Sequence, residues 1–99
     1  MTDRDQSITH CEKRELHIIN RRGLHARAAA KFVRITNGSA SRVWVGRDGN
    51  RVDGTAIMDL LMLAAVQGTT ITVEAEGPDA ADVIEALDSL VKNRFDESD

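Results

Sequence analysis

His25 has the sequence setting most suited to chemistry. It directly precedes Ala26–Asn37, a segment with helical periodicity, and follows the turn residue Gly23. The partial positive charge at a helix N-terminus disfavours the imidazolium, so we expect a neutral, nucleophilic ring. The N–H groups of Ala26 to Ala28 and the guanidinium of Arg27 could bind phosphate oxygens. A histidine that accepts a phosphoryl group fits this pattern, although spacing alone leaves a surface histidine that caps the helix as the simpler interpretation.

The other two histidines and the cysteine are weaker candidates. His10 and Cys11 are adjacent, but two potential ligands are too few to define a metal site, and we expect neither a metal nor a cofactor. His17 lies in a predicted strand, where a surface position is expected. A single cysteine excludes an internal disulfide and indicates a reducing compartment.

The hydrophobic patterns predict the elements that must position His25. Alternation predicts strands over 14–20, 41–46, 51–53 and 70–76, and helical spacing predicts helices over 26–37, 56–66 and 79–93. Asp48-Gly49 predicts a hairpin turn between the second and third strands. Strands with one polar face imply helices packed on the other face. We therefore predict an α+β fold, an open-faced two-layer sandwich of a four-stranded antiparallel sheet with three helices on one face, in the order βαββαβα.

Composition restricts the class of protein. The chain has 99 residues, of which 41% are hydrophobic and 29% charged, and this predicts a single globular domain without a large cleft. The formal charge of −3 argues against general nucleic-acid binding. No apolar run could span a bilayer and the polar N-terminus is not a secretory signal, so we expect a cytoplasmic protein without membrane insertion. Without a nucleotide-binding loop or a metal cluster, a hydrolase or independent kinase is not expected.

Charge is unevenly distributed along the chain. Residues 13–34 carry seven basic side chains against the single acid Glu15, whereas residues 74–99 carry nine acids against Lys92 and Arg94. The basic third could attract an acidic partner or a phosphoryl group. The alternative is that these charges are ordinary solvated surface.

Two separated motifs carry a family resemblance. Gly23–Ala29 (GLHARAA) and Val52–Met58 (VDGTAIM), the latter followed by an apolar run, stand at the same separation as two signatures of a known family. They resemble the HPr family, the histidine phosphocarriers of the phosphoenolpyruvate-dependent phosphotransferase system. Gly77-Pro78-Asp79, at the start of the last helix, also fits. The resemblance covers residues 12–95, which predicts an HPr-like domain there, a mobile tail over 1–11 and a C-terminal tail over 96–99.

The resemblance implies a role for each matched residue. His25 would carry the phosphoryl group on Nδ1, accepting it from a phosphohistidine of enzyme I and passing it to a histidine of an enzyme IIA-type protein. Arg27 and the backbone N–H groups of Ala26 and Ala28 would bind the phosphoryl group. The chain would then be a monomeric component of a relay and not an independent enzyme.

The resemblance also implies a docking surface beside His25. The predicted helix 56–66 is apolar nearly all round, and methionine adapts to several partners. The core side would comprise Leu60, Leu63 and Ala64. The partner-docking set would comprise Ile57, Met58, Leu61 and Arg34. A wholly buried helix is the alternative that the residues alone leave open.

Two departures from the family pattern bear on function. Ala28 replaces the usual proline, as in alphaproteobacterial members, and adds an N–H near the phosphoryl site. Ala56 replaces the serine through which Gram-positive members are regulated, so we expect no regulatory site, with Thr55 capping the second helix. The missing serine favours a regulatory, nitrogen-related carrier. A carrier for sugar uptake and a regulatory docking module on the same fold are the alternatives.

Overall fold

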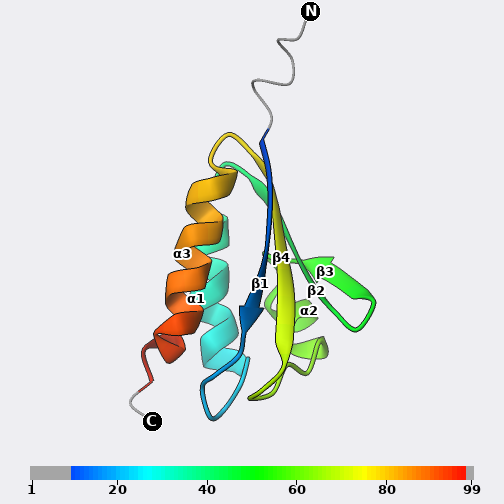
Figure 1. The fold of residues 1–99 in the computed structure, drawn as a ribbon, viewed down its shortest axis with the longest axis vertical. Coiled ribbons are helices and arrows are strands. Elements are labelled where there is room, and N and C mark those ends of the chain that lie inside the picture. Colours follow the sequence, from blue (N-terminus) through cyan, green and yellow to red (C-terminus); the bar gives the residue numbers. More distant parts are fainter. Residues whose placement is uncertain (1–9, 98–99) are drawn as a thin grey trace, which may run out of the picture.

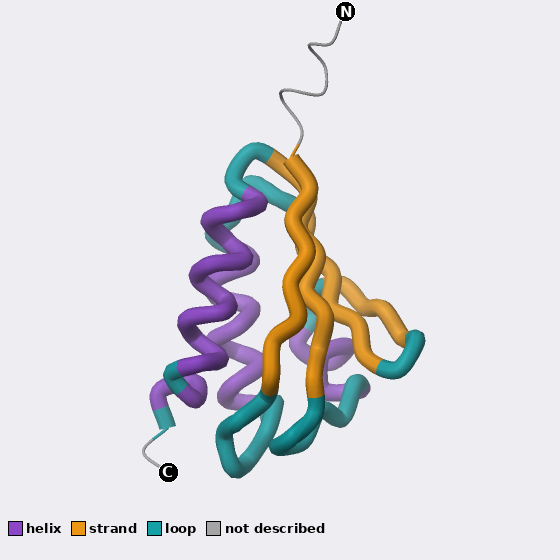
Figure 2. The backbone as a smooth tube through the Cα atoms, in the orientation of Figure 1, coloured by secondary structure: helices purple, strands orange, loops and turns teal. Residues whose placement is uncertain are grey.

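Residues 10–97 are described by a computed structural model. The elements are β1 (His10–His17), α1 (Ala26–Asn37), β2 (Arg42–Arg47), β3 (Asn50–Asp53), α2 (Ile57–Met62), β4 (Thr70–Gly77), α3 (Ala80–Lys92) and the 3₁₀ turn η2 (Arg94–Asp96). The strands form one antiparallel sheet in the order β1-β4-β2-β3, with the helices on one face (Figures 1 and 2). The predicted α+β sandwich is therefore confirmed. No helix in this part of the chain is long and apolar enough to cross a bilayer.

The core lies between the sheet and the helices. The residues that alternate inward along the strands are buried, and they pack on the apolar stripes of α1 and α3. The largest fully buried side chains include Leu16, Ile18, Phe32, Val45, Leu60, Ile71, Val73, Ile84, Leu87 and Phe95. The other face of the sheet is open, and there Arg42 and Arg51 both stack on the ring of Trp44.

The ends of α1 are where the sequence predicts them. Alanine-rich helical spacing begins directly after His25, and the N–H of Gly38 donates to the carbonyl of Ile35 to close the last turn. Both signals are local, so packing does not move them.

Helix α2 is shorter than the predicted helix over 56–66. It ends at Met62, and Ala64 takes the left-handed conformation with φ 51°. The carbonyl of Ala65 accepts a hydrogen bond from the N–H of Leu24 at 2.9 Å, so the loop before α1 holds this segment out of the helix. The expectation that Thr55 caps α2 is wrong, because the N-cap is Ala56.

Both ends of the described chain differ from the predicted tails. His10 and Cys11 belong to β1, where they pair with Gly77 and Glu76 of β4. Asp96 belongs to η2, and Glu97 follows it against the domain. The remaining residues of the predicted tails, 1–9 and 98–99, lie outside the described residues.

Charges that are separated in the sequence pair in the structure. Arg14 on β1 contacts Glu85 at 3.1 Å and Asp88 at 2.8 Å, both on α3. Lys31 on α1 lies 3.9 Å from Asp96. The basic N-terminal third therefore faces the acidic C-terminal third, and part of its charge is neutralised within the domain.

Candidate functional site

His25 lies at the N-terminus of α1. It is the N-cap residue, with extended backbone angles φ −83° and ψ −179°, and its carbonyl accepts the N–H of Ala29 at 2.8 Å. Its imidazole makes no capping hydrogen bond, and the side chain is 21% exposed. The backbone of His25 thus starts the helix, while its ring has no role as a helix cap.

The turn before His25 requires glycine. Gly23 has φ +68°, and a Cβ there would lie 2.6 Å from the carbonyl oxygen of Ala65. The buried side chain of Asn20 donates through Nδ2 to the carbonyl of Gly23 at 2.8 Å. On the other side, Leu24 is hydrogen-bonded to Ala65. These contacts fix the position of the His25 backbone.

The first turn of α1 is suited to an anion. The N–H groups of Ala26, Arg27 and Ala28 precede the first intrahelical donor, so the helix itself gives them no acceptor. No acidic residue lies in this turn, and Arg27 is exposed on it. The partial positive charge of the helix end and the guanidinium therefore act in the same place. The arrangement can bind a phosphoryl group beside the imidazole.

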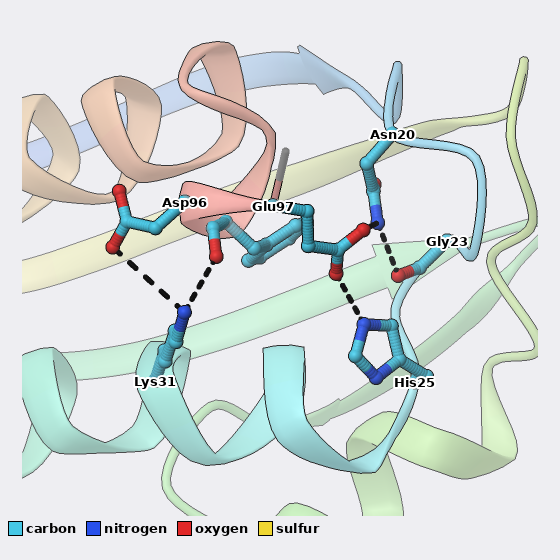
Figure 3. Close-up of polar contacts among 7 residues, drawn as sticks. Asn20, Gly23, His25, Lys31, Asp96 and Glu97 are labelled. Atoms are coloured by element: carbon cyan, nitrogen blue, oxygen red, sulfur yellow. Dashed lines mark hydrogen bonds and ion pairs between the residues drawn. The ribbon is translucent and has the colours of Figure 1, made fainter. Parts of the chain in front are cut away.

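A carboxylate from the end of the chain contacts His25. Oε2 of Glu97 is hydrogen-bonded to Nε2 of His25, and Oε1 accepts from Nδ2 of Asn20 at 3.1 Å (Figure 3). Burial acts to raise the pKa of Glu97, but hydrogen bonds from His25 and Asn20 and the nearby charge of Arg22 hold it below its usual value. The carboxylate is consequently ionised at neutral pH.

Residues 93–97, which we call the C-terminal hook, bring Glu97 to this position. Arg94, Phe95 and Asp96 have left-handed φ values of 57°, 53° and 63°, which cost about 1–2 kcal/mol each for side-chain-bearing residues. The hook is anchored because Phe95 is fully buried, which contributes about 1.5–3 kcal/mol. In addition, Nζ of Lys31 donates to the carbonyl of Phe95 at 2.7 Å.

The predicted docking residues differ in exposure. Met58 is 70% exposed and Ile57 is 37% exposed, whereas Leu61 is half-buried and packs against the core. Two apolar side chains outside the predicted set, Met62 and Val66, are 79% and 59% exposed. Because α2 ends early, Met62 and Val66 are exposed to solvent. The longer helix predicted over 56–66 did not indicate this exposure.

The remaining predicted site residues lie in the last turn of α1, at the start of α2 and at the start of β1. Arg34 is exposed in the last turn of α1, and Ala56 is the half-buried N-cap of α2. The Thr55 hydroxyl donates to Oδ1 of Asp53 at 2.7 Å. Between residues 10 and 97, no three side chains of the metal-binding types group together, so His10 and Cys11 gain no third ligand there.

Sequence reasoning missed Asn20, Lys31 and Glu97 as parts of the site. One signal for them was available, because Phe95 is an aromatic residue that follows the end of the last predicted helix. Such a residue indicates that the chain returns to the core instead of leaving as a tail. The partner of Glu97 could not be identified, since it lies 72 positions away in the sequence.

Comparisons with known proteins agree with this geometry. Residues 12–93 match the family model described as "PTS HPr component phosphorylation site". The chain is 44% identical to the phosphocarrier protein HPr of Cupriavidus necator over 88% of its own length and 98% of that relative. It is 46% identical to the HPr of Pseudomonas aeruginosa over 86% and 96% of the two chains. The crystal structure of HPr-C-His from Thermoanaerobacter tengcongensis superposes with a TM-score of 0.84 at 36% identity, over 88% and 98% of the two chains.

Proposed function

The chain belongs to the HPr family, the phosphocarriers of the phosphotransferase system, and from this premise we propose that His25 is the residue that carries the phosphoryl group. The observation that carries the proposal is the position of His25. Its backbone begins α1 while its imidazole stays uncommitted to the helix end, next to N–H groups that lack helical acceptors. A second feature supports it, since Arg27 is exposed on the same turn.

In the proposed reaction, the phosphoryl group moves between two imidazoles. Nδ1 of His25 attacks the phosphorus of a phosphohistidine on enzyme I, a new P–N bond forms, and the electron pair of the old P–N bond returns to the donor nitrogen. The N–H groups of Ala26 and Ala28 and the guanidinium of Arg27 bind the phosphoryl oxygens. In the second transfer His25 is the donor: a histidine nitrogen of an enzyme IIA-type protein attacks the phosphorus, and the electron pair of the broken P–N bond returns to Nδ1 of His25.

We infer that both partners dock on the exposed apolar side chains around α2. The set comprises Ile57, Met58, Met62 and Val66, with Leu61 beneath it and Arg34 as a basic rim. Methionine side chains adapt to differently shaped surfaces, which suits a protein with a donor and an acceptor. Since both partners must reach His25, their binding is mutually exclusive.

We propose that the carrier serves the regulatory, nitrogen-related branch of the system. Ala56 offers no hydroxyl for regulation by serine phosphorylation, and the neighbouring Thr55 hydroxyl is occupied by Asp53. A phosphate on Thr55 would be repelled by that carboxylate. A carrier for sugar uptake is the second candidate. Transfer from the phosphorylated chain to purified enzyme IIA-type proteins of each branch distinguishes the two.

We further propose that the protein acts as a monomer in the cytoplasm. Four large exposed apolar side chains lie in or just after α2, where partner docking requires them to be accessible, and this supports a monomer. Light scattering of the purified chain tests that proposal. A stable dimer that covers Met58 and Met62 would contradict it.

The site assignment is tested by intact mass before and after incubation with enzyme I, magnesium and phosphoenolpyruvate. We expect one phosphate on the unmodified chain and none on His25→Ala. His17→Ala is the matched control, because His17 is exposed at the end of β1 and bonded to Thr70. Phosphate on His25→Ala, or its loss from His17→Ala, overturns the assignment. No gain on the unmodified chain with active enzyme I would favour the docking-module alternative.

A further inference from the structure

The contact between Glu97 and His25 involves only one of the two ring nitrogens. Nε2 is bonded to Oε2 of Glu97, and Nδ1 lies on the side of the ring that points away from this carboxylate (Figure 3). An ionised carboxylate can only accept hydrogen bonds. In a neutral imidazole this contact therefore requires the proton on Nε2 and leaves the lone pair on Nδ1.

The carboxylate is itself held in place from two sides. Oε1 accepts from Nδ2 of Asn20, and the same Nδ2 donates to the carbonyl of Gly23 in the turn that positions His25. The backbone that precedes Glu97 is anchored by buried Phe95 and by Lys31, which contacts both the Phe95 carbonyl and Asp96 (Figure 3). One amide group thus links the position of Glu97 to the backbone of the turn before His25.

We propose that the C-terminal hook is part of the phosphoryl-transfer site and that Glu97 is its positioning residue. Glu97 holds the His25 ring in the tautomer with hydrogen on Nε2 and in the orientation that presents Nδ1 to the phosphoryl donor. It touches neither phosphorus nor the attacking nitrogen and acts only through the far side of the ring. This inference rests on the proposed role of His25 as the phosphoryl acceptor.

The left-handed conformation of the hook supports a functional role. Three consecutive side-chain-bearing residues, Arg94 to Asp96, adopt positive φ, which is uncommon and is found where the surrounding structure enforces it. Without this reversal of direction after α3, Glu97 could not return to α1. The contact between the Glu97 carboxylate and His25 therefore explains why the hook adopts this uncommon backbone conformation.

The test has two readouts on Glu97→Ala. Long-range ¹H–¹⁵N spectra of imidazole-labelled protein distinguish a protonated from an unprotonated ring nitrogen, and the His25→Ala spectrum identifies the signals of His25. We expect the Nε2–H tautomer in the unmodified chain and a mixture in Glu97→Ala. Phosphorylation of Glu97→Ala by enzyme I should be slowed by about tenfold or more, as for a lost hydrogen bond to a charged group.

The matched control is Glu85→Ala, which removes an exposed carboxylate on α3 that pairs with Arg14 and does not contact His25 or the hook. It should keep the tautomer and the transfer rate of the unmodified chain. If Glu97→Ala does not fold, Glu97→Gln replaces it, because the amide keeps the size of the side chain but can pair with either tautomer. An Nδ1–H tautomer in the unmodified chain, or an unchanged tautomer in a folded Glu97 variant, overturns the inference. The tautomer is measured without enzyme I, so it stays decisive if His25 proves not to be phosphorylated.

Discussion

His25 contributes to the molecule through its backbone and separately through its ring. Its carbonyl accepts the first intrahelical hydrogen bond of α1, which ties the residue to the helix. Its ring makes no bond to the helix end and instead contacts Glu97. This division lets a side chain change its chemical state while the fold stays the same. His25→Ala is accordingly expected to remove phosphorylation without unfolding the domain.

The two exposed arginines of α1 are expected to act on different steps. Arg27 lies on the first turn beside His25, whereas Arg34 lies in the last turn. Arg27→Ala should lower kcat for phosphorylation by enzyme I about ten- to a hundredfold, since it removes the charge-assisted hydrogen bond that we propose to the phosphoryl group. Arg34→Ala should raise KM several-fold with little change in kcat, as for a charge at the rim of an interface. Equal effects of both changes on kcat would contradict this division.

Among the elements, α2 combines a short length with two different faces. Leu60 is fully buried, while Met58 and Met62 on the outer face are more than two-thirds exposed. The helix ends after Met62 because Ala65 is bonded to the loop that precedes His25. The same contact therefore limits α2 and joins the segment that follows the exposed methionines to the loop before His25.

Changes on the two faces of α2 should have opposite consequences. Met58→Glu or Met62→Glu places a charge in the proposed docking surface, so each should raise KM for enzyme I about tenfold and leave the melting temperature nearly unchanged. Leu60→Ala should instead lower the free energy of unfolding by about 2–5 kcal/mol through the cavity that it creates. Steady-state kinetics and thermal unfolding separate these outcomes. A large fall in the melting temperature of Met58→Glu would show that Met58 belongs to the core.

Across the whole molecule, the last third of the chain stabilises the first third by polar contacts as well as by the core. Arg14 is paired with α3, and Lys31 binds the hook. At the opposite end, the carboxylate of Asp79 before α3 is hydrogen-bonded to Ser41 and accepts the N–H of Ala40 at 3.0 Å. The domain is thereby tied together at both ends of α3.

The contacts of Asp79 predict a pH-dependent stability. Hydrogen bonds from Ser41, from the N–H of Ala40 and from Ser39 hold the pKa of Asp79 below the ordinary value for aspartate, about 3.9. A lowered pKa in the folded state means that the stabilisation is complete above the ordinary value and is lost as the pH falls through the lowered one. Asp79→Ala should therefore reduce the melting temperature at neutral pH by roughly a few degrees.

The pH dependence provides the check on this prediction. The difference between Asp79→Ala and the unmodified chain should shrink as the solution is acidified below about pH 3.9. Asp82→Ala, which removes an exposed carboxylate from the first turn of α3, should give a smaller difference at neutral pH. A gap for Asp79→Ala that persists unchanged into acid would show that its hydrogen bonds are not the source of the effect.

The sequence by itself determined the features that depend on neighbouring residues. The periodicity of α1 and its Gly38 stop, the alternation of β2 and β4, and the Asp48-Gly49 turn are local, and the structure keeps them. The order of these elements was enough to predict the α+β sandwich. The position of His25 before α1 followed from the same local signals.

Only the tertiary structure decided the features that depend on distant residues. The end of α2 is set by the bond from Leu24 to Ala65, and the start of β1 is set by pairing with β4. Residues 96 and 97 were predicted as part of a tail, but they belong to the C-terminal hook, because burial of Phe95 favours the return of this segment to the core. That return brings Glu97 to His25, a contact between residues 72 positions apart that no local pattern could indicate.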